Sequence, residues 1–234
     1  MPLIDPVLLP PDYDTGVYSR QVSHDGTDPH ARGYRRSWRG LVFVYRTGAL
    51  QPFASRLERD AASVLQARPA TVALERASRS VEYRDGARWR RYTPDWVVFV
   101  DDDPAPFVVE VKPSERAAEL QGMLSAVRHA VHRTGAPFVV MTEQEIYQRN
   151  RFANSTALCA AGRLQGLDGR DVIRMRAFVR SRASTSVLDL VADGWKRASA
   201  RDLLMHLAAW GDCTFDMSRP FHDRTPLATR ERPR

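Results

Sequence analysis

The sequence predicts an α/β protein in which helices flank a mixed β-sheet and a small, mainly helical domain follows. Residues 96–100 (WVVFV) and 107–111 (FVVEV) are short apolar runs without alternation, as in central strands covered on both faces. A third apolar run, 137–141, follows a helical pattern, and such strand–helix–strand connections join parallel neighbours. After about residue 150 the pattern changes to helices with short loops, which predicts the second domain.

Composition is that of an ordinary globular protein. The chain has 234 residues, 43% hydrophobic and 27% charged, which is enough for one large domain or two small ones. No apolar run is long enough to span a membrane, and the N-terminus lacks the pattern of a secretory signal. With only Cys159 and Cys213, the chain is expected to be cytoplasmic and free of disulfides. The net charge of +7 favours a polyanionic partner, although many basic proteins bind no DNA.

Lysine is rare in this chain. Of the 35 basic residues, only Lys112 and Lys196 are lysines, and the rest are arginines. Lysine is a compact point charge whose proton can be shifted, whereas arginine is nearly always charged. A lysine inside a catalytic pattern is therefore informative here, and Lys112 follows one of the two central strands.

The N-terminal region divides into an arm and a basic segment. Residues 1–30 are rich in Pro and Asp and are expected to form an extended arm. In residues 30–46, arginines alternate with aromatic residues, a combination that suits phosphate contact and base stacking. A basic loop leading into a strand at 41–45 is an equal alternative. The candidate DNA-binding residues are Arg35, Arg36, Trp38, Arg39 and, farther along, Arg91.

The remaining elements follow from periodicity and stop signals. Ser55 is a candidate N-cap for a helix with apolar residues at 57, 61, 64 and 65, and Gly135 ends a later helix. In chain order we expect that first helix, weak strands at 71–74 and 80–83, the two central strands, a helix at 114–134, the strand at 137–141, an amphipathic helix at 201–210 and a short strand at 213–215. The predicted domains are the arm at 1–30, a catalytic domain at 31–150, a helical domain at 151–224 of winged-helix or helix-turn-helix type, and a disordered tail at 225–234.

The hairpin from Asp95 to Lys112 brings three ionisable groups together. If its turn is centred between Asp103 and Pro104, Asp95 lies opposite Lys112 and diagonal to Glu110. Cross-strand neighbours have Cβ atoms about 5 Å apart and diagonal ones about 7–8 Å, so the two carboxylates can converge on one Mg²⁺. A different turn would shift this register by one or two residues.

These groups are the ones that phosphodiester hydrolysis requires. Carboxylates hold Mg²⁺, which neutralises charge and lowers the pKa of a bound water, and a nearby lysine can orient or deprotonate that water. Asp95, Glu110 and the carbonyl of Val111 are the expected metal ligands, with Mn²⁺ able to replace Mg²⁺, and Lys112 would serve the nucleophile. The alternative is a structural ion pair at a strand end.

Glu58 is the fourth candidate for the catalytic and metal-binding set. It shares a helix face with Ala61, Ala62 and Leu65, so its carboxylate is expected to point inward. Ser55 and Glu58 also have the spacing of a capping box, in which the glutamate only satisfies the helix start. Glu75 is the alternative fourth acid.

The segments RYTPDW at 91–96 and VEVKP at 109–113 resemble the PD-(D/E)xK nucleases, and more narrowly the TnsA family of transposon endonucleases. Further similar segments are SRLERD at 55–60, MTEQEI at 141–146 and the leucine-rich helix with Asp216 and Pro220. One departure is Glu110, where glutamine can stand in the family; a carboxylate strengthens the case for metal binding.

The resemblance implies a restriction-endonuclease-like sheet and cleavage of double-stranded DNA at the 5′ ends of a transposon. It also implies two protein partners, a DDE transposase (TnsB-like) and an AAA+ regulator (TnsC-like). Two alternatives stay open: a stand-alone nuclease of restriction, repair or phage DNA processing, and a non-catalytic DNA-binding protein.

Overall fold

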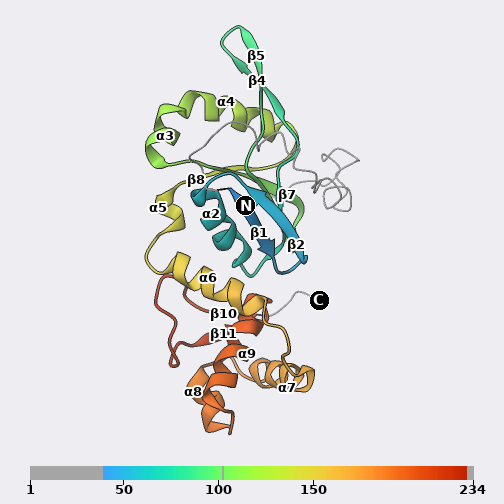
Figure 1. The fold of residues 1–234 in the computed structure, drawn as a ribbon, viewed down its shortest axis with the longest axis vertical. Coiled ribbons are helices and arrows are strands. Elements are labelled where there is room, and N and C mark those ends of the chain that lie inside the picture. Colours follow the sequence, from blue (N-terminus) through green and yellow to red (C-terminus); the bar gives the residue numbers. More distant parts are fainter. Residues whose placement is uncertain (1–38, 102, 231–234) are drawn as a thin grey trace. The chain divides into compact units, whose positions relative to one another are not determined.

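The computed structural model describes residues 39–101 and 103–230, which divide into two compact units (Figure 1). The first unit ends at Ile146, and the second begins at Tyr147 and also includes residues 63–70. The predicted boundary lay after residue 150. The expected arm at 1–30 and the candidate DNA-binding residues Arg35, Arg36 and Trp38 lie outside the described residues. None of the described helices combines the length and the apolar character needed to cross a membrane.

A four-stranded mixed sheet forms the centre of the first unit. Its strands run in the order β3 (Thr71–Arg76), β6 (Trp96–Val100), β7 (Asp103–Val111) and β8 (Phe138–Met141). The first two pairings are antiparallel, and β7 pairs with β8 in parallel, as the sequence predicts. The central strands are buried, in agreement with their unbroken apolar sequences.

The register between β6 and β7 differs from the prediction. Trp96 pairs with Val109, so Asp95, one residue earlier, lies across from Glu110 rather than from Lys112. The turn is tighter than expected, because Val100 already pairs with Asp103. The register shifts between this pair and the pair of Val98 with Phe107. The prolines at 104 and 106 fall in this irregular part, where their missing N–H groups cost no ladder hydrogen bond. A shift of two residues leaves every side chain on its predicted face.

Helices and two small hairpins complete the first unit. Helix α2 (Arg56–Gln66) begins after Ser55 as predicted, and the expected helix at 114–134 is divided at Leu120 into α3 (Ser114–Glu119) and α4 (Gln121–His132). Helix α5 (Glu143–Ile146) follows β8. The hairpins are β1 (Gly40–Val44) with β2 (Ala49–Phe53), and β4 (Val81–Asp85) with β5 (Arg88–Tyr92). Strands β2 and β5 were not predicted, because one contains a proline and the other is mostly charged.

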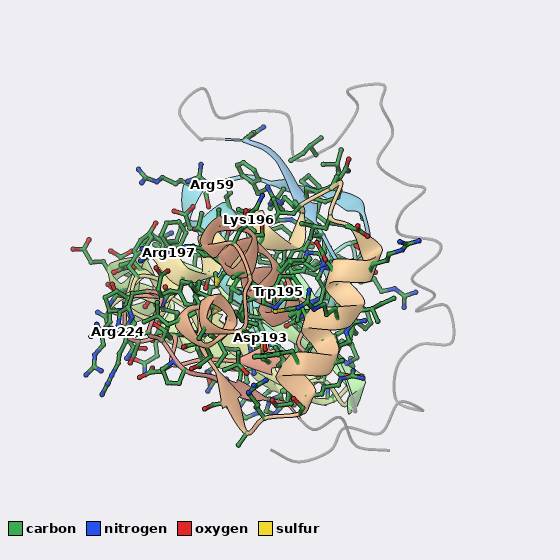
Figure 2. All side chains as sticks on the ribbon, turned by 90° about the horizontal axis from the view of Figure 1, so that it is seen from below. Arg59, Asp193, Trp195, Lys196, Arg197 and Arg224 are labelled. Atoms are coloured by element: carbon green, nitrogen blue, oxygen red, sulfur yellow. The ribbon has the colours of Figure 1, made fainter. Side chains whose placement is uncertain are left out.

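The second unit is largely helical and contains a small sheet. Its helices are α6 (Arg151–Gly162), α7 (Gly169–Arg180), α8 (Val187–Ala192) and α9 (Arg197–Ala209), and its strands are β9 (Ser184–Thr185), β10 (Cys213–Thr214) and β11 (Leu227–Thr229). The buried side chains of α9 form its core, and α6, α7 and α8 pack against this helix. Asp193, Trp195 and Lys196 lie in the turn between α8 and α9 (Figure 2).

The prediction of a disordered tail from residue 225 was wrong for its first part. Strand β11 pairs with both β9 and β10, and Leu227 is fully buried between them. A single leucine in a polar sequence gives no local signal for a strand; the pairing depends on strands more than ten residues away. Residues 231–234 lie outside the described residues.

Candidate active site

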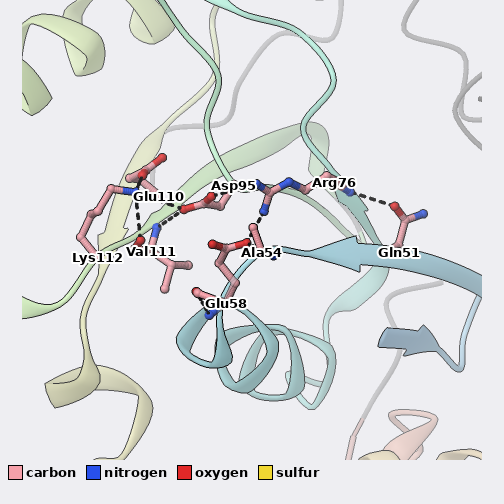
Figure 3. A network of polar contacts seen from close by, with 9 residues as sticks. Gln51, Ala54, Glu58, Arg76, Asp95, Glu110, Val111 and Lys112 are labelled. Atoms are coloured by element: carbon pink, nitrogen blue, oxygen red, sulfur yellow. Dashed lines mark hydrogen bonds and ion pairs between the residues drawn. The ribbon is translucent and has the colours of Figure 1, made fainter. Parts of the chain in front are cut away.

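Three side chains converge where β6 begins and β7 ends (Figure 3). Asp95 immediately precedes β6, Glu110 is the last residue but one of β7, and Lys112 immediately follows that strand. Because Glu110 and Lys112 are two residues apart, they share a face of the sheet. The first unit therefore brings together the two acids and the amine that the sequence pairs.

The Lys112 ammonium is shared by three oxygen atoms. Its Nζ donates to Glu110 Oε1 and lies 3.2 Å from the carbonyl oxygen of Val111 and 3.7 Å from Asp95 Oδ2. These are the three groups that the sequence predicts as metal ligands. The ion pair expected as the structural alternative is thus present, and the same oxygen atoms face one cationic position.

Glu110 is the most deeply buried member of the group. Its side chain is about 1% exposed, and its Oε2 atom has no hydrogen-bond partner among the described residues. Burial, and then the neighbouring Asp95 carboxylate, raise the pKa of Glu110 to about 8. Burial, the charge of Glu110 and a side-chain hydrogen bond to Glu110 raise the pKa of Tyr92, so this phenol keeps its proton and remains a donor beside the Glu110 carboxyl. The Oε2 atom itself still has no partner at a normal hydrogen-bond distance among the described residues, which is costly for a buried carboxylate oxygen unless a ligand satisfies it.

Asp95 is held by contacts to both of its oxygen atoms. Oδ2 accepts a hydrogen bond from the backbone N–H of Val111 at 2.8 Å, and Oδ1 lies 3.2 Å from Arg76 Nη2. The first contact connects Asp95 to the strand that carries Glu110. The carboxylate is therefore fixed before any ligand binds.

Arg76 connects Asp95 to Glu58, and sequence reasoning missed it. Its Nη1 lies 2.6 Å from Glu58 Oε2, and its backbone N–H donates to Gln51 Oε1 (Figure 3). Its guanidinium lies over the Trp96 ring. In a chain so rich in arginine, Arg76 has no distinguishing sequence signal. Only the pairing of β3 with β6, which sets Arg76 across from Trp96, brings it to the acids.

Glu58 takes part in helix capping and in the charged network around Arg76. Ser55 Oγ accepts the backbone N–H of Glu58 at 3.1 Å, as in a capping box, but the glutamate carboxylate accepts the N–H of Ala54 rather than that of Ser55. The same oxygen, Oε2, also contacts Arg76. Helix capping and membership of the charged network are therefore compatible.

A family comparison adds the identity of this region. The matching model, TnsA-like endonuclease N terminal, covers residues 64–143, from the last turn of α2 to the first residue of α5. Residues 64–143 belong to the TnsA-like endonuclease N-terminal family. The matched region of this TnsA-like domain includes Arg76, Asp95, Glu110 and Lys112, but not Glu58. The chain matches no curated protein.

Other candidates lie apart from the charged network of the TnsA-like domain. Glu75 is across from Val97 on the sheet, and burial raises its pKa to about 7, but it forms no ion pair with the described residues. Arg91 is exposed on β5 and pairs with Glu82 at 3.2 Å. Arg39 is exposed at the start of the described chain.

The donor set of the TnsA-like domain fits a hard divalent cation. The described residues contain no group of three or more His, Cys, Asp or Glu side chains that could hold a metal. The available donors are two carboxylates and one backbone carbonyl, all oxygen, which suit Mg²⁺ bound with several waters. If fully ionised, the three acids Glu58, Asp95 and Glu110 exceed the two cations Arg76 and Lys112 by one negative charge. With a pKa of about 8 Glu110 is mostly protonated at neutral pH, and an added cation would favour its ionised form and satisfy the orphan Oε2.

Proposed function

We propose that the TnsA-like domain is a Mg²⁺-dependent DNA endonuclease and that Asp95, Glu110, Lys112 and Glu58 form its active centre. Asp95, Glu110 and the Val111 carbonyl would hold the metal, with Glu58 beside them, and Mn²⁺ would substitute for Mg²⁺. The observation that carries the proposal is the convergence of three oxygen ligands on one cationic position, with a buried carboxylate oxygen left without a partner. The match to an endonuclease family supports a DNA substrate.

The protein residues have separable tasks in this reaction. When bound, a divalent ion supplies charge neutralisation at the phosphate and a lower pKa for a coordinated water. Burial lowers the pKa of Lys112, but Asp95, Glu110 and their hydrogen bond raise it above its ordinary value overall. A bound divalent ion would offset the two carboxylates that raise this pKa, so we infer that Lys112 orients or deprotonates the water and balances negative charge on the phosphate. Arg76 holds Asp95 and Glu58 in register.

We further propose that the chain is the TnsA-like subunit of a heteromeric transposase that cuts at the 5′ ends of a transposon. Its partners would be a TnsB-like DDE transposase and a TnsC-like AAA+ regulator. The family match supports this for the first unit. In the second unit, the order α7, β9, α8, α9, β10, β11, with β11 between the other strands, supports a winged-helix assignment. In helix α9, the counterpart of a recognition helix, the exposed Arg197 and Arg201 are both paired with Asp223, which favours protein contact over base reading.

Cleavage assays with and without partners test the proposal. The purified chain is incubated with Mg²⁺ and linear DNA that carries transposon ends, alone and with a TnsB-like transposase. We expect 5′-strand cleavage at the ends that requires the partner and is lost in Asp95→Asn. Sequence-specific cutting by the chain alone would instead identify a stand-alone nuclease. DNA binding without cleavage under either condition would contradict the nuclease assignment.

A further inference from the structure

The β4–β5 hairpin extends beyond helix α4 as a two-stranded arm (Figure 1). Asp85 pairs with Arg88, so the loop consists of Gly86 and Ala87, and Gly86 has a φ of 58°, which glycine adopts without steric cost. The residues from 84 to 91 are all exposed. Among them is Trp89, whose side chain is 65% exposed and therefore contributes little to the folded core.

The two faces of this arm differ along its length. Near its base, Tyr83 and Tyr92 are in edge contact, with ring centroids 6.4 Å apart, and Tyr83 packs with Leu124 and Val127 of α4. On the opposite face, Trp89 lies directly across from Arg84, and Arg91 is two residues along the strand. The base thus fixes the arm to the domain, and the outer face combines an aromatic ring with arginines.

The charges on the arm are not balanced. Asp85 is paired with Arg90 at 2.6 Å, and Glu82 is paired with Arg91 at 3.2 Å. Arg84 and Arg88 form no ion pair with any described residue. The tip of the arm therefore presents two uncompensated guanidinium groups, that of Arg84 on the same face as the exposed Trp89 indole and that of Arg88 on the opposite face.

We propose that the β4–β5 hairpin is a DNA-contacting arm that holds duplex DNA beside the cleavage site, an inference that rests on the proposed nuclease function. A two-stranded ribbon fits the major groove, arginines bind phosphates, and an exposed indole can stack on or wedge against bases. The base of the arm leads directly into the site, because Asp95 follows Tyr92 by three residues. DNA bound by the arm would therefore be held close to the strand end that carries the acids.

The length of the arm fixes where this contact falls. Trp89 precedes Asp95 by six residues, which span at most about 20 Å of extended chain. At about 3.4 Å per base pair, this corresponds to roughly six base pairs from the phosphate that is cut. The charge of the tip favours DNA over an apolar protein surface, where the two arginines would be desolvated without partners.

Binding of a fluorescein-labelled 30-base-pair duplex to the full-length chain in EDTA tests this proposal without cleavage. Trp89→Ala is expected to bind about tenfold more weakly, and Trp89→Phe, which keeps an aromatic face, to retain most of the affinity. Arg84→Gln/Arg88→Gln is expected to reduce the slope of log K against log salt by about two. Matched controls are Ile173→Ala, another exposed apolar residue, and Arg133→Gln/Arg170→Gln, which removes the same charge from exposed helix positions.

Each outcome decides the proposal. Hairpin variants that weaken binding while the control variants do not would support it. If the wild-type chain binds DNA and the hairpin variants bind equally well, the arm proposal is overturned, the nuclease proposal stands, and a protein becomes the candidate partner of this surface. If the wild-type chain binds no duplex at any salt concentration, the arm proposal is overturned, and the cleavage assay with the partner decides the nuclease proposal separately. Because the substituted side chains are exposed, unchanged thermal unfolding checks that the variants are folded.

Discussion

Replacing Arg76 by methionine removes the cation that lies between two buried carboxylates. The arginine side chain is 16% exposed, and those of Glu58 and Asp95 are 10% and 7% exposed. The contacts are 2.6 Å and 3.2 Å long, so both acids lose a charged donor at once. Methionine keeps an unbranched apolar side chain and removes the guanidinium that lies over the Trp96 ring, so the change is mainly electrostatic.

The expected cost follows from what the acids retain. Removing one partner of a buried ion pair costs about 3–5 kcal/mol, because a charge is left without compensation. Glu58 still accepts the N–H of Ala54, and Asp95 still accepts that of Val111 and lies 3.7 Å from the Lys112 ammonium. These remaining contacts favour the lower end of that range, a loss of about 3 kcal/mol in the free energy of unfolding. For a chain of this size the melting temperature should then fall by roughly 6–12 °C.

Calorimetric unfolding in EDTA measures this loss. Arg91→Met is the matched control, because the Arg91–Glu82 pair is exposed and such pairs contribute about 1 kcal/mol or less. In Arg76→Met/Glu58→Gln most of the loss should be recovered, since one of the stranded charges is removed with the arginine. Added Mg²⁺ should raise the melting temperature more in Arg76→Met than in the wild type, because the more negative site binds a cation more tightly.

Two results would refute the reasoning. The first is a loss of stability in Arg76→Met no larger than that in Arg91→Met, which would mean that the arginine does not compensate the buried acids. The second is a loss in the double variant equal to the sum of the two single losses, which would mean that Arg76 and Glu58 are not energetically coupled.

The remaining predictions concern individual acids and the lysine. Asp95→Asn, Glu110→Gln and Lys112→Ala should each abolish Mg²⁺-dependent cleavage and leave DNA binding largely intact; unimpaired cutting by one variant would exclude its residue from the active centre. Glu58→Gln should lower cleavage steeply, and its loss of stability should be smaller than that of Arg76→Met, because glutamine can still accept the N–H of Ala54 and Arg76 keeps Asp95 as a partner. Retained cleavage would make Glu58 a cap only. Glu75→Gln should be more stable than the wild type at pH 8 by roughly 1–2 kcal/mol and about equal to it at pH 4. The raised pKa means that native Glu75 holds its proton up to about pH 7, whereas the unfolded chain releases it near pH 4.5, so Glu75 lowers stability as the pH rises through this window. A Glu75→Gln advantage that is the same at both pH values would contradict this.

The sequence predicted what depends on local periodicity. Alternation along a strand sets Glu110 and Lys112 on one face of the sheet. Because the predicted register was wrong by two residues, that face did not change, and the predicted convergence with Asp95 was still correct. Helix α2 and the inward direction of Glu58 follow from its spacing to Ala61 and Leu65 in the same way.

The features that were missed depend on pairing between segments without a strong local pattern. Arg76 reaches the acids only through the pairing of β3 with β6, and Gln51 reaches Arg76 from a strand interrupted by proline. Strand β11 gains its stability from two distant strands. The β5 strand is charged on both faces, so no apolar alternation marks it as a strand.

Mn²⁺ binding measured by titration calorimetry tests the central claim most directly, because it needs neither a DNA target nor a partner protein. The wild-type chain should bind Mn²⁺, and Asp95→Asn and Glu110→Gln should lose that binding while they remain folded, with Glu82→Gln on the exposed hairpin as a matched acid control. If both site variants bound Mn²⁺ as well as the wild type, the two strand ends would not form a metal site, and the proposed chemistry would have no centre.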